Sequence, residues 1–403
     1  MHIDVEAVKA ALAILKTYKG ELEKEISILT DGSATSSNQR AKIIAWAQEV
    51  HNIVLDSYTR PYIAEVLPTI GNPQVKRVLE IRQQLGKTST AKYKAMLNAV
   101  CEDSRIRDTL MYCGASTGRW SGKLVQVQNL PRSSTTNPAE DIADIKTASL
   151  ANIEVKHKDV MAFMSSSIRS MICAPSGKKL IVADFAAIEA RIIAWLSNCN
   201  LALDQFNKQI DAYKSMAASI YSTTIDLVTK EQRQLGKAVI LGCGFGMGAK
   251  TFLATCAAKG IVLDEELAQA SVTSYRTTFR EIPKLWRDQH LATLKAVRTG
   301  SQVQCGRVTW FTHNDFLHCK LPSGRCLSYK SPEIILQENS WNRESYQIAY
   351  MGKTSGDKFT RVTTYGGKIV ENIVQAIARD LMATSMLRLE SYGYKTSFTV
   401  HDE

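Results

Sequence analysis

The amino-acid sequence predicts an α+β protein, in which long helices alternate with a few strands that are grouped along the chain. Residues 4–29 and 372–389 carry apolar side chains at helical spacing, which is typical of helices that bury one face. Residues 345–351 and 359–368 flank the turn-forming stretch GKTSGDK, and this pattern predicts a β-hairpin. Residues 180–183 form an unbroken apolar run after a Ser-Gly pair, which predicts a short buried strand.

Composition limits the class of protein. Lys and Arg total 50 against 39 Asp and Glu, so the net charge is +11, and this favours a polyanionic partner. The nine cysteines include no CxxC pair, which favours free thiols in a reducing compartment. The N-terminus lacks the features of a signal peptide, and no apolar run approaches the roughly 18 residues that a membrane span needs. We therefore expect a soluble, cytoplasmic protein without a membrane partner.

The N-terminal region is predicted to be helical. The near-heptad stripe over residues 4–29 predicts one long packing helix, and the polar stretch 30–38 predicts a loop. Ser36 and Gln39 resemble a capping box that opens a second helix through Ile43 and Trp46.

Residues 73–132 are strongly basic, with eleven basic and four acidic residues and a segment charge of +7. Interleaved hydroxyl and amide side chains add neutral phosphate donors, which favours a nucleic-acid backbone as ligand. A solvated helix face is the alternative interpretation. The basic residues are Lys76, Arg77, Arg82, Lys87, Lys92, Lys94, Arg105, Arg107, Arg119, Lys123 and Arg132. A polar linker, residues 133–141, follows this segment.

Asp184 lies where the predicted strand ends and a helix begins, because the apolar spacing becomes helical from Ala186 onwards. Glu189 then lies in the first turns of that helix. Asp184 is either the N-cap of this helix or a charge that requires a cationic partner. This segment alone leaves both interpretations open.

Residues 201–320 are predicted to be mostly helical, with one helix starting at the EIPKLW stretch, residues 281–286. Within residues 231–248, Arg233, Lys237, Leu241 and Phe245 recur every four positions and are expected to form one stripe on a helix. Two cations at this spacing suit a ligand with several negative charges, such as a triphosphate, and Phe245 offers a ring on which a base can stack. An ordinary surface helix is the alternative.

The last ten residues, YKTSFTVHDE, predict a strand that ends near Asp402. If this strand lies beside the strand that ends at Asp184, two carboxylates meet at one edge of a sheet, and a divalent metal resolves their repulsion. Mg²⁺ prefers one or two carboxylates together with substrate phosphates. Combined with Arg233 and Lys237, these residues indicate metal-assisted nucleotidyl transfer.

Six blocks in one order resemble the DNA polymerases of family A, the group of bacterial DNA polymerase I and many phage replicases. The blocks ADFAAIEAR, RxxxKxxxxxxxFG and VHDE resemble its three polymerase motifs. The blocks TGRWSG, VQNLPR and VQAIARDLM resemble further family segments. The resemblance runs from about Ser89 to Glu403, with a weaker helical match before it.

This resemblance implies a right-hand fold with an antiparallel palm sheet, helical fingers and a helical thumb. The thumb-like region is expected over residues 1–115 and the first part of the palm over residues 116–204. The fingers are expected over residues 205–320 and the second part of the palm over residues 321–403. The palm sheet is expected to carry Asp184 and Asp402.

The resemblance also assigns roles at the reaction centre. Asp184, Asp402 and the backbone carbonyl of Phe185 are expected to bind two Mg²⁺ ions. One ion lowers the pKa of the primer 3′-hydroxyl and the other neutralises the leaving pyrophosphate. Arg233 and Lys237 are expected to hold the incoming dNTP, with Lys237 as the proton donor to the leaving group.

Other roles concern specificity and DNA contact. Glu189 matches the residue whose side chain blocks a ribose 2′-hydroxyl, and Phe245 replaces the family's usual Tyr beside the templating base. Leu241 replaces a usual aromatic residue, and Tyr213 replaces a common His that touches a phosphate. The residues expected to contact primer–template DNA are Arg119, Gln128, Asn129, Gln375 and His401.

Two weaker sites are set aside. Asp4 and Glu6 resemble a proofreading exonuclease motif but stand alone at a helix start. Cys305, His313, His318, Cys319 and Cys326 lack the CxxC pair of a zinc finger.

The resemblance leads us to expect a fragment or one half of a split gene, because family members continue past the last motif and usually begin with an exonuclease or exonuclease-like domain. A metal ligand at the penultimate residue is also physically unusual, because chain ends fray. The expected function is template-directed DNA synthesis in replication or repair. The alternatives are a non-catalytic fragment that binds primer–template DNA and a single-subunit phage-type RNA polymerase.

Overall fold

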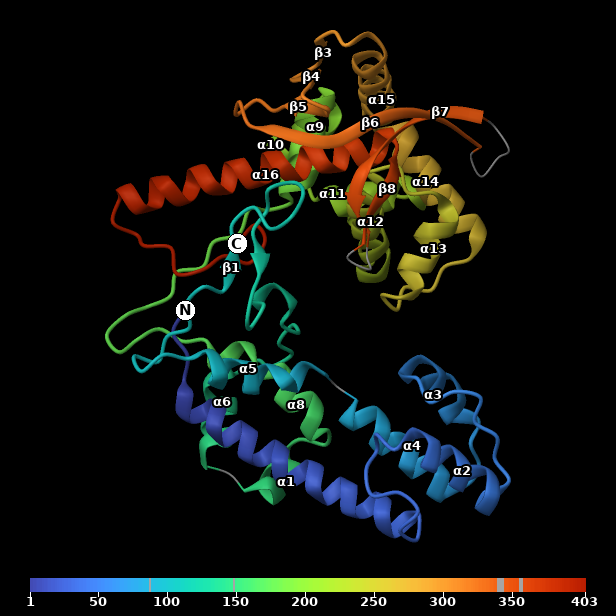
Figure 1. Ribbon diagram of the computed structural model, residues 1–403, viewed down its shortest axis with the longest axis vertical. Coiled ribbons are helices and arrows are strands. Elements are labelled where there is room, and N and C mark those ends of the chain that lie inside the picture. The colour runs from blue at the N-terminus through green and yellow to red at the C-terminus, as the bar shows by residue number, and fades with distance from the viewer. Residues whose placement is uncertain (87, 148, 339–343, 355–357) are drawn as a thin grey trace. The chain divides into compact units, whose positions relative to one another are not determined.

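The structure is a computed structural model, and it describes residues 1–403 except 87, 148, 339–343 and 355–357. The chain divides into two compact units, which are described separately (Figure 1). Unit 1 contains Met1–Met111 and Ser121–Val182, and unit 2 contains Tyr112–Trp120 and Ala183–Glu403. Among the described residues, no helix has both the length and the apolar character needed to cross a membrane.

Unit 1 is mainly helical. Its α-helices are α1 (Val5–Leu29), α2 (Arg40–His51), α3 (Arg60–Val66), α4 (Pro73–Leu85), α5 (Ala91–Ala99), α6 (Pro138–Thr147), α7 (Leu150–Lys156) and α8 (Val160–Ser166). Its 3₁₀ turns are η1 (Leu67–Thr69), η2 (Thr88–Thr90), η3 (Val127–Asn129) and η4 (Arg169–Met171). Strand β1 (Leu110–Met111) pairs antiparallel with β2 (Ser121–Gly122).

Helix α1 confirms the prediction of a long N-terminal packing helix. Its buried side chains include Val8, Leu22 and Ile26, spaced so that they share one face. Asp4 is the N-cap, because its Oδ1 accepts a 3.0 Å hydrogen bond from the backbone N–H of Ala7. Helix capping therefore explains why an aspartate stands at position 4.

The predicted capping box of the second helix is wrong. Helix α2 begins at Arg40 and has no side-chain cap. The Gln39 side chain instead accepts a 2.8 Å hydrogen bond from the backbone N–H of Thr35, and the Ser36 hydroxyl donates to Glu23 of α1 at 2.9 Å. The Ser36 hydroxyl oxygen also accepts a 3.4 Å hydrogen bond from the backbone N–H of Asn38, so it closes the turn before the helix and does not cap the helix itself.

Unit 2 combines helices with one sheet. Its α-helices are α9 (Ile188–Ser197), α10 (Asn200–Asn207), α11 (Ala212–Ile220), α12 (Lys230–Cys243), α13 (Ala249–Ala257), α14 (Glu265–Thr278), α15 (Glu281–Thr299) and α16 (Gly366–Ser391), with the 3₁₀ turn η5 (Ile225–Leu227). Its strands are β3 (Val303–Cys305), β4 (Val308–His313), β5 (Phe316–Lys320), β6 (Cys326–Glu338), β7 (Glu344–Lys353) and β8 (Phe359–Thr364).

The six strands form one antiparallel sheet in sequence order, from β3 to β8. The predicted hairpin is confirmed, because β7 pairs with β8 from Ile348–Thr364 to Lys353–Phe359; residues 355–357 of its turn lie outside the described residues. The prediction of helix up to residue 320 is wrong from residue 303 onwards. Strands β3–β5 alternate more buried and less buried positions over only a few residues each, and the helix-based interpretation missed this short period.

Helices α15 and α16 pack with the sheet in the core of unit 2; α16 is the long red helix that runs along the sheet in Figure 1. Trp310 of β4 is fully buried, and its indole N–H donates a 2.7 Å hydrogen bond to Gln289 of α15. Asn372 of α16 likewise donates to the buried Tyr329 hydroxyl at 3.1 Å. Each buried polar atom in these pairs has a partner, so helices and sheet are held in register.

The two strands predicted around the aspartates are both absent. Residues 178–185 and 394–400 have no strand assignment, and the sheet comprises only strands between Val303 and Thr364. Leu180, Ile181 and Val182 are 41%, 79% and 67% exposed. An apolar run becomes a strand only when a neighbouring strand supplies its hydrogen bonds, and no described segment pairs with this one. The expectation that the sheet carries Asp184 and Asp402 is therefore wrong.

Candidate active site

Asp184 and Asp402 lie on segments joined by a backbone hydrogen bond. The N–H of Phe185 donates to the carbonyl of Asp402 at 3.1 Å. Reciprocal backbone bonds between Val400 and Glu403, at 2.9 and 3.1 Å, close a turn around Asp402. His401 adopts a positive φ of 60° in this turn. The two aspartates thus come together through loop backbone and not through a sheet edge.

The donor atoms present here fit Mg²⁺. In the part of the chain that the structure describes, no hydrogen bond or ion pair engages the side chain of Asp184 or Asp402. Carboxylate and carbonyl oxygens are the ligands that Mg²⁺ prefers, and this ion commonly takes its remaining ligands from water and substrate phosphates. Within the described residues, no group of three or more His, Cys, Asp or Glu side chains is arranged to hold a metal. The carboxylates of Asp184 and Asp402 and the carbonyl of Phe185 are therefore donors of the kind that Mg²⁺ takes.

Glu189 is paired with Arg119. The Arg119 Nη2 donates to Glu189 Oε1 at 2.6 Å, and the two side chains are 24% and 32% exposed. Glu189 occupies the first turn of α9, as its spacing from the apolar positions predicts. The structure thus joins a residue expected at the primer terminus to a residue expected at the nucleotide sugar.

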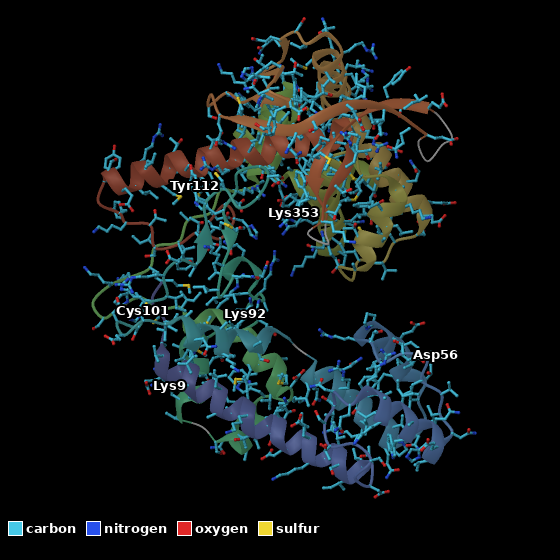
Figure 2. All side chains as sticks on the ribbon, in the orientation of Figure 1. Lys9, Asp56, Lys92, Cys101, Tyr112 and Lys353 are labelled. Atoms are coloured by element: carbon cyan, nitrogen blue, oxygen red, sulfur yellow. The ribbon has the colours of Figure 1, made fainter. Side chains whose placement is uncertain are left out.

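The loop that carries Arg119, residues 112–120, is anchored by one buried cation, Arg379. Arg379 of α16 donates from Nε to the Gly118 carbonyl at 3.0 Å. Its guanidinium also lies over the rings of Tyr112 and Trp120, at 5.2 and 4.9 Å from their centroids; Figure 2 labels Tyr112 beside the α16 ribbon. Tyr112 and Trp120 are the first and last residues of this loop, so one guanidinium that contacts both rings holds both of its ends.

Helix α12 presents the expected cations. Thr229 and Gln232 form a capping box at its start, which fixes the helix entry. Arg233 donates from Nε to Asp211 Oδ2 at 2.7 Å. Arg233 and Lys237 both lie over the Tyr213 ring, at 5.2 and 5.9 Å from its centroid. The two cations therefore share one aromatic surface.

Asp211 has two structural functions here. It is the N-cap of α11, because Oδ1 accepts from the backbone N–H groups of Tyr213 and Lys214 at 3.0 and 3.1 Å. Burial raises the pKa of Asp211, but the Arg233 guanidinium and the two N–H donors outweigh this effect, so its pKa lies below the ordinary value. Burial raises the pKa of the Tyr213 hydroxyl, so this group stays protonated and can donate a hydrogen bond.

The close packing of α11 against α12 determines where the Tyr213 ring lies relative to Arg233 and Lys237. A Cβ at Gly236 would collide with the carbonyl oxygen of Tyr213, so only glycine lets the helices approach this closely. Leu241 is 45% exposed on α12. Phe245 lies beyond the helix, which ends at Cys243; the prediction of one stripe from Arg233 to Phe245 is therefore wrong at its last member.

The turn around Phe245 is held against α15 and α16. Gly246 has a φ of 86°, which favours glycine and turns the chain away from the helix. The Trp286 indole N–H donates to the Gly244 carbonyl at 2.8 Å. A Cβ at Gly367 would collide with the carbonyl oxygen of Phe245. These contacts fix the Phe245 backbone and leave its ring partly exposed.

The remaining candidate DNA contacts are divided between the units. Gln375 of α16 donates to Glu371 at 3.1 Å in unit 2, which also contains Arg119 and His401. Gln128 and Asn129 belong to unit 1. The amide of Asn129 donates to Gln126 at 3.1 Å, whereas Gln128 Oε1 is buried without a partner among the described residues.

The basic segment, residues 73–132, is only partly neutralised. Arg77 pairs with Glu25 at 2.6 Å, and Arg107 pairs with Asp103 at 2.6 Å. Lys87 lies outside the described residues. Within the described chain, no ion pair involves these basic residues: Lys76, Arg82, Lys92, Lys94, Lys123 and Arg132. Their charges remain available to a polyanion.

The Cys and His group set aside in the sequence lies on strands β3–β6. Cys319 is buried, and His318 Nδ1 lies 2.9 Å from the Ser328 hydroxyl. Cys319 faces Leu327 and Lys320 faces Cys326 across the β5–β6 pair. This group forms part of the sheet, and across the described residues no three His, Cys, Asp or Glu side chains are arranged to hold a metal ion.

Sequence reasoning missed Asp211 and Arg379. Asp211 directly precedes an apolar-periodic helix, which is the signature of an N-cap, but its pairing with Arg233 crosses two helices. Arg379 occupies a core-facing position of α16 and is only 9% exposed. An arginine on the apolar face of a helix is the available signal, because such a charge requires partners.

Comparisons with known proteins agree with this architecture. The family model described as DNA polymerase family A matches residues 6–316. The DNA polymerase of Bacillus phage SP02 is 37% identical over 411 aligned residues, which cover this whole chain and 62% of the phage protein. DNA polymerase I of Pseudomonas aeruginosa is 28% identical over 203 residues, which cover 50% of this chain and 18% of that protein.

A solved structure supports the same fold. The polymerase domain of Pol1 from M. smegmatis, in complex with DNA primer-template and dNTP, matches 100% of this chain and 60% of that chain, with a TM-score of 0.56 at 16% identity. The chain thus spans about six-tenths of the phage relative and of this neighbour. The expected fold, a right-hand polymerase architecture with helices and an antiparallel sheet, is confirmed by this match. By its family match over most of its length, the chain belongs to DNA polymerase family A.

Proposed function

We propose that the chain performs template-directed DNA synthesis, in which a primer 3′-hydroxyl attacks a dNTP and releases pyrophosphate. The observation that carries this proposal is the bond between Phe185 and Asp402, which brings two metal-ligand candidates together from distant segments. Its substrates would be primer–template DNA and dNTPs, as in the titled complex of the structural neighbour. A role in replication or repair and a cytoplasmic location are part of the proposal, supported by the phage relative.

The chain's own residues supply three functions in this proposal. Asp184, Asp402 and the Phe185 carbonyl would hold two Mg²⁺ ions, which lower the pKa of the 3′-hydroxyl and neutralise the leaving group. Arg233 and Lys237 would bind the triphosphate, and Lys237 would donate a proton to the leaving oxygen. Asp211 would keep Arg233 oriented, so that the guanidinium is placed before substrate arrives.

Specificity would come from the residues around the nucleotide. Glu189 would exclude a ribose 2′-hydroxyl, and the Phe245 ring would stack beside the templating base. Tyr213 would contact a phosphate of the dNTP, and Leu241 would lie at the position that affects discrimination against dideoxynucleotides. DNA would be bound by Arg119, Gln128, Asn129, Gln375 and His401.

The basic surface of unit 1 supports DNA binding. Arg60 and Arg132 line one hollow together with the hydroxyls of Ser89, Ser134 and Ser165. Guanidinium and hydroxyl groups in one hollow are suitable partners for a phosphate.

We also propose the hand-like division into a thumb-like region (1–115), a two-part palm (116–204 and 321–403) and fingers (205–320). The helices of residues 1–111 support a separate thumb-like region. The first palm segment is shared between the units, because residues 121–182 pack with the N-terminal helices and residues 183–204 with unit 2.

A second candidate function is primer–template binding without catalysis. It is favoured by one observation, namely that neither Asp184 nor Asp402 lies on a strand that would hold its carboxylate rigidly. Catalysis needs its groups held to about an ångström, whereas binding tolerates mobile loops.

Primer extension separates the two candidates. A labelled primer–template is incubated with dNTPs and Mg²⁺, using the parent chain and Asp184→Asn, which removes the charge but keeps the side-chain volume. We expect extension by the parent alone and equal DNA affinity for both. DNA binding without extension by the parent would favour the second candidate, and extension by Asp184→Asn at the parental rate would refute the metal-ligand role.

A further inference from the structure

We infer that Arg119 is a specificity-positioning residue whose ion pair holds Glu189 in the orientation that selects the sugar of the nucleotide. This inference rests on the proposed function and adds to it. Arg119 is expected from resemblance to contact the primer terminus; the geometry assigns it a second function, at the incoming nucleotide.

The contact itself is short and partly shielded. Arg119 Nη2 and Glu189 Oε1 are 2.6 Å apart, with 24% and 32% of the two side chains exposed. A glutamate side chain loses substantial rotamer freedom when it is held in one place. A side chain that excludes a single ribose hydroxyl must nevertheless be held in one place, so Glu189 needs a partner that fixes its carboxylate. Among the described interactions, Arg119 is the side chain that contacts it.

Arg119 can fix Glu189 because its own backbone is fixed. The Ala115 N–H donates to the Arg119 carbonyl at 3.1 Å, and Arg379 binds the carbonyl of the preceding Gly118. Gly118 has a φ of 83°, and any Cβ there would press on the guanidinium of Arg325. Arg325 is in turn bound to Asp380 at 2.8 Å. Because its loop is supported in this way, Arg119 can hold the Glu189 carboxylate with the sub-ångström precision that sugar selection requires.

Neighbouring groups do not offer the same support. Arg191 follows Glu189 by two positions, but its Nε donates to the Ala186 carbonyl at 2.9 Å and its guanidinium lies 4.6 Å from the Phe206 ring centroid. Arg191 therefore contacts other groups. Among the described residues, Arg119 is the one whose side chain is hydrogen-bonded to the Glu189 carboxylate.

The simpler explanation is that the Arg119–Glu189 ion pair only stabilises the fold. The small free energy that such pairs contribute argues against this explanation. Partly exposed ion pairs contribute little to folding, whereas a positioned carboxylate changes the discrimination between two sugars directly. The two explanations differ in what the Arg119→Gln variant loses: thermal stability in the first, sugar preference in the second.

The test measures equilibrium binding of dATP and ATP to the full chain in complex with a primer–template whose primer ends in a dideoxynucleotide, so that no reaction occurs. The variants are Arg119→Gln, Arg119→Lys, Glu189→Ala and the double variant Arg119→Gln with Glu189→Ala. Arg361→Gln is the matched control, since it breaks a partly exposed ion pair with Glu333, 3.1 Å long, in the same unit.

We expect Arg119→Gln to lower the preference for dATP over ATP by about tenfold, in addition to any loss of affinity that the two nucleotides share. Arg119→Lys should lie between Arg119→Gln and the parent, because it keeps the charge but loses the planar fork. The double variant should be no less selective than Glu189→Ala alone, since the two changes remove the same function. Arg361→Gln should retain the parental preference.

Two results would overturn the inference. One is an unchanged sugar preference in Arg119→Gln, even if DNA or dATP binds more weakly; the other is a parent chain that binds dATP no better than ATP. Primer extension by the same preparations reports separately on the proposed function. A parent that prefers dATP but fails to extend would disprove catalysis and leave the positioning role in place.

Discussion

The backbone N–H of Phe185 donates a 3.1 Å hydrogen bond to the backbone carbonyl of Asp402. This bond uses main-chain atoms alone, so it survives changes to either side chain. It therefore allows the carboxylate chemistry of the site to be tested apart from the arrangement of its segments.

The first prediction concerns Asp402→Ala. The variant keeps the backbone bond to Phe185 but loses the carboxylate, so we expect primer extension to fall by about 10³-fold or more. The midpoint of thermal unfolding should stay within a few degrees of the parent, since Asp402 is a loop residue at the end of the described chain. Glu266→Ala is the matched control, because Glu266 is an exposed carboxylate in the first turn of α14 in the same unit, and it should keep activity within about threefold. Parental extension rates in Asp402→Ala would contradict the metal-ligand role.

The second prediction separates Arg233 from Lys237. Arg233→Gln should raise the KM for dNTP about tenfold or more, because a charge-assisted contact to phosphate is lost. Lys237→Gln should mainly lower kcat, since a proton donor acts in the transition state. Steady-state kinetics with a saturating primer–template measures both constants.

Lys230→Gln is the control for both substitutions, because Lys230 is an exposed cation at the start of the same helix. Its KM and kcat should match the parent. If Lys237→Gln changed KM with kcat unaltered, Lys237 would be a binding residue and not a proton donor.

The third prediction concerns pH. The pKa of Asp211 lies below its ordinary value of 3.8 in the folded protein. The Asp211–Arg233 pair therefore stabilises the fold above that ordinary value, and the stabilisation is lost as pH falls through the lowered folded pKa. Asp211→Asn keeps an N-cap side chain but loses the charge.

Thermal unfolding of the parent and Asp211→Asn should differ at pH 7, by less than about 1 kcal/mol in unfolding free energy, because the pair is about one-third exposed. The difference should shrink as the pH falls below 3.8 and through the lowered pKa of Asp211 in the folded protein. A difference that grew as the pH fell would show that Asp211 stabilises the fold through its protonated form.

The fourth prediction concerns the contact between α11 and α12. Gly236→Ala forces a methyl group against the Tyr213 carbonyl, and the resulting overpacking should cost about 1–3 kcal/mol of unfolding free energy. The shift of Tyr213 and Arg233 should also raise the KM for dNTP.

Gly242→Ala, on the same helix, is the matched control. Its added methyl would meet Met247 Sδ at 3.6 Å and Phe252 at 3.8 Å, which are ordinary contact distances. Replacing glycine by alanine within a helix stabilises it by about 0.5–1 kcal/mol, so this variant should be at least as stable as the parent. Equal destabilisation of the two variants would contradict a specific contact at Gly236.

Helices were predicted best from the sequence. The long apolar stripes of α1 and α16 were identified because a helix buries one face whatever it packs against. The β7–β8 hairpin was also identified, since its strands are adjacent along the chain and need no distant partner. Glu189 was correctly placed in the first turn of α9 for the same local reason.

Strand predictions failed in two ways: one predicted strand has no pairing partner among the described residues, and three short strands that pair with their neighbours along the chain were missed. Residues 180–183 have the composition of a buried strand, yet Ile181 is 79% exposed and no described strand lies beside it. Strands β3–β5 were overlooked because each is short and the flanking pattern is helical. Strand formation depends on a neighbour that supplies hydrogen bonds, and a neighbour is a property of the fold.

The sequence by itself determined the family, the order of the motifs, and the residue types available for chemistry, because these are written as spacings along one chain. Only the tertiary structure decided which side chains meet. It paired Arg119 with Glu189 and Arg233 with Asp211, and it joined Phe185 to Asp402 through backbone atoms. The physical reason is range: helical period and capping act over a few residues, whereas an ion pair depends on how separate elements pack.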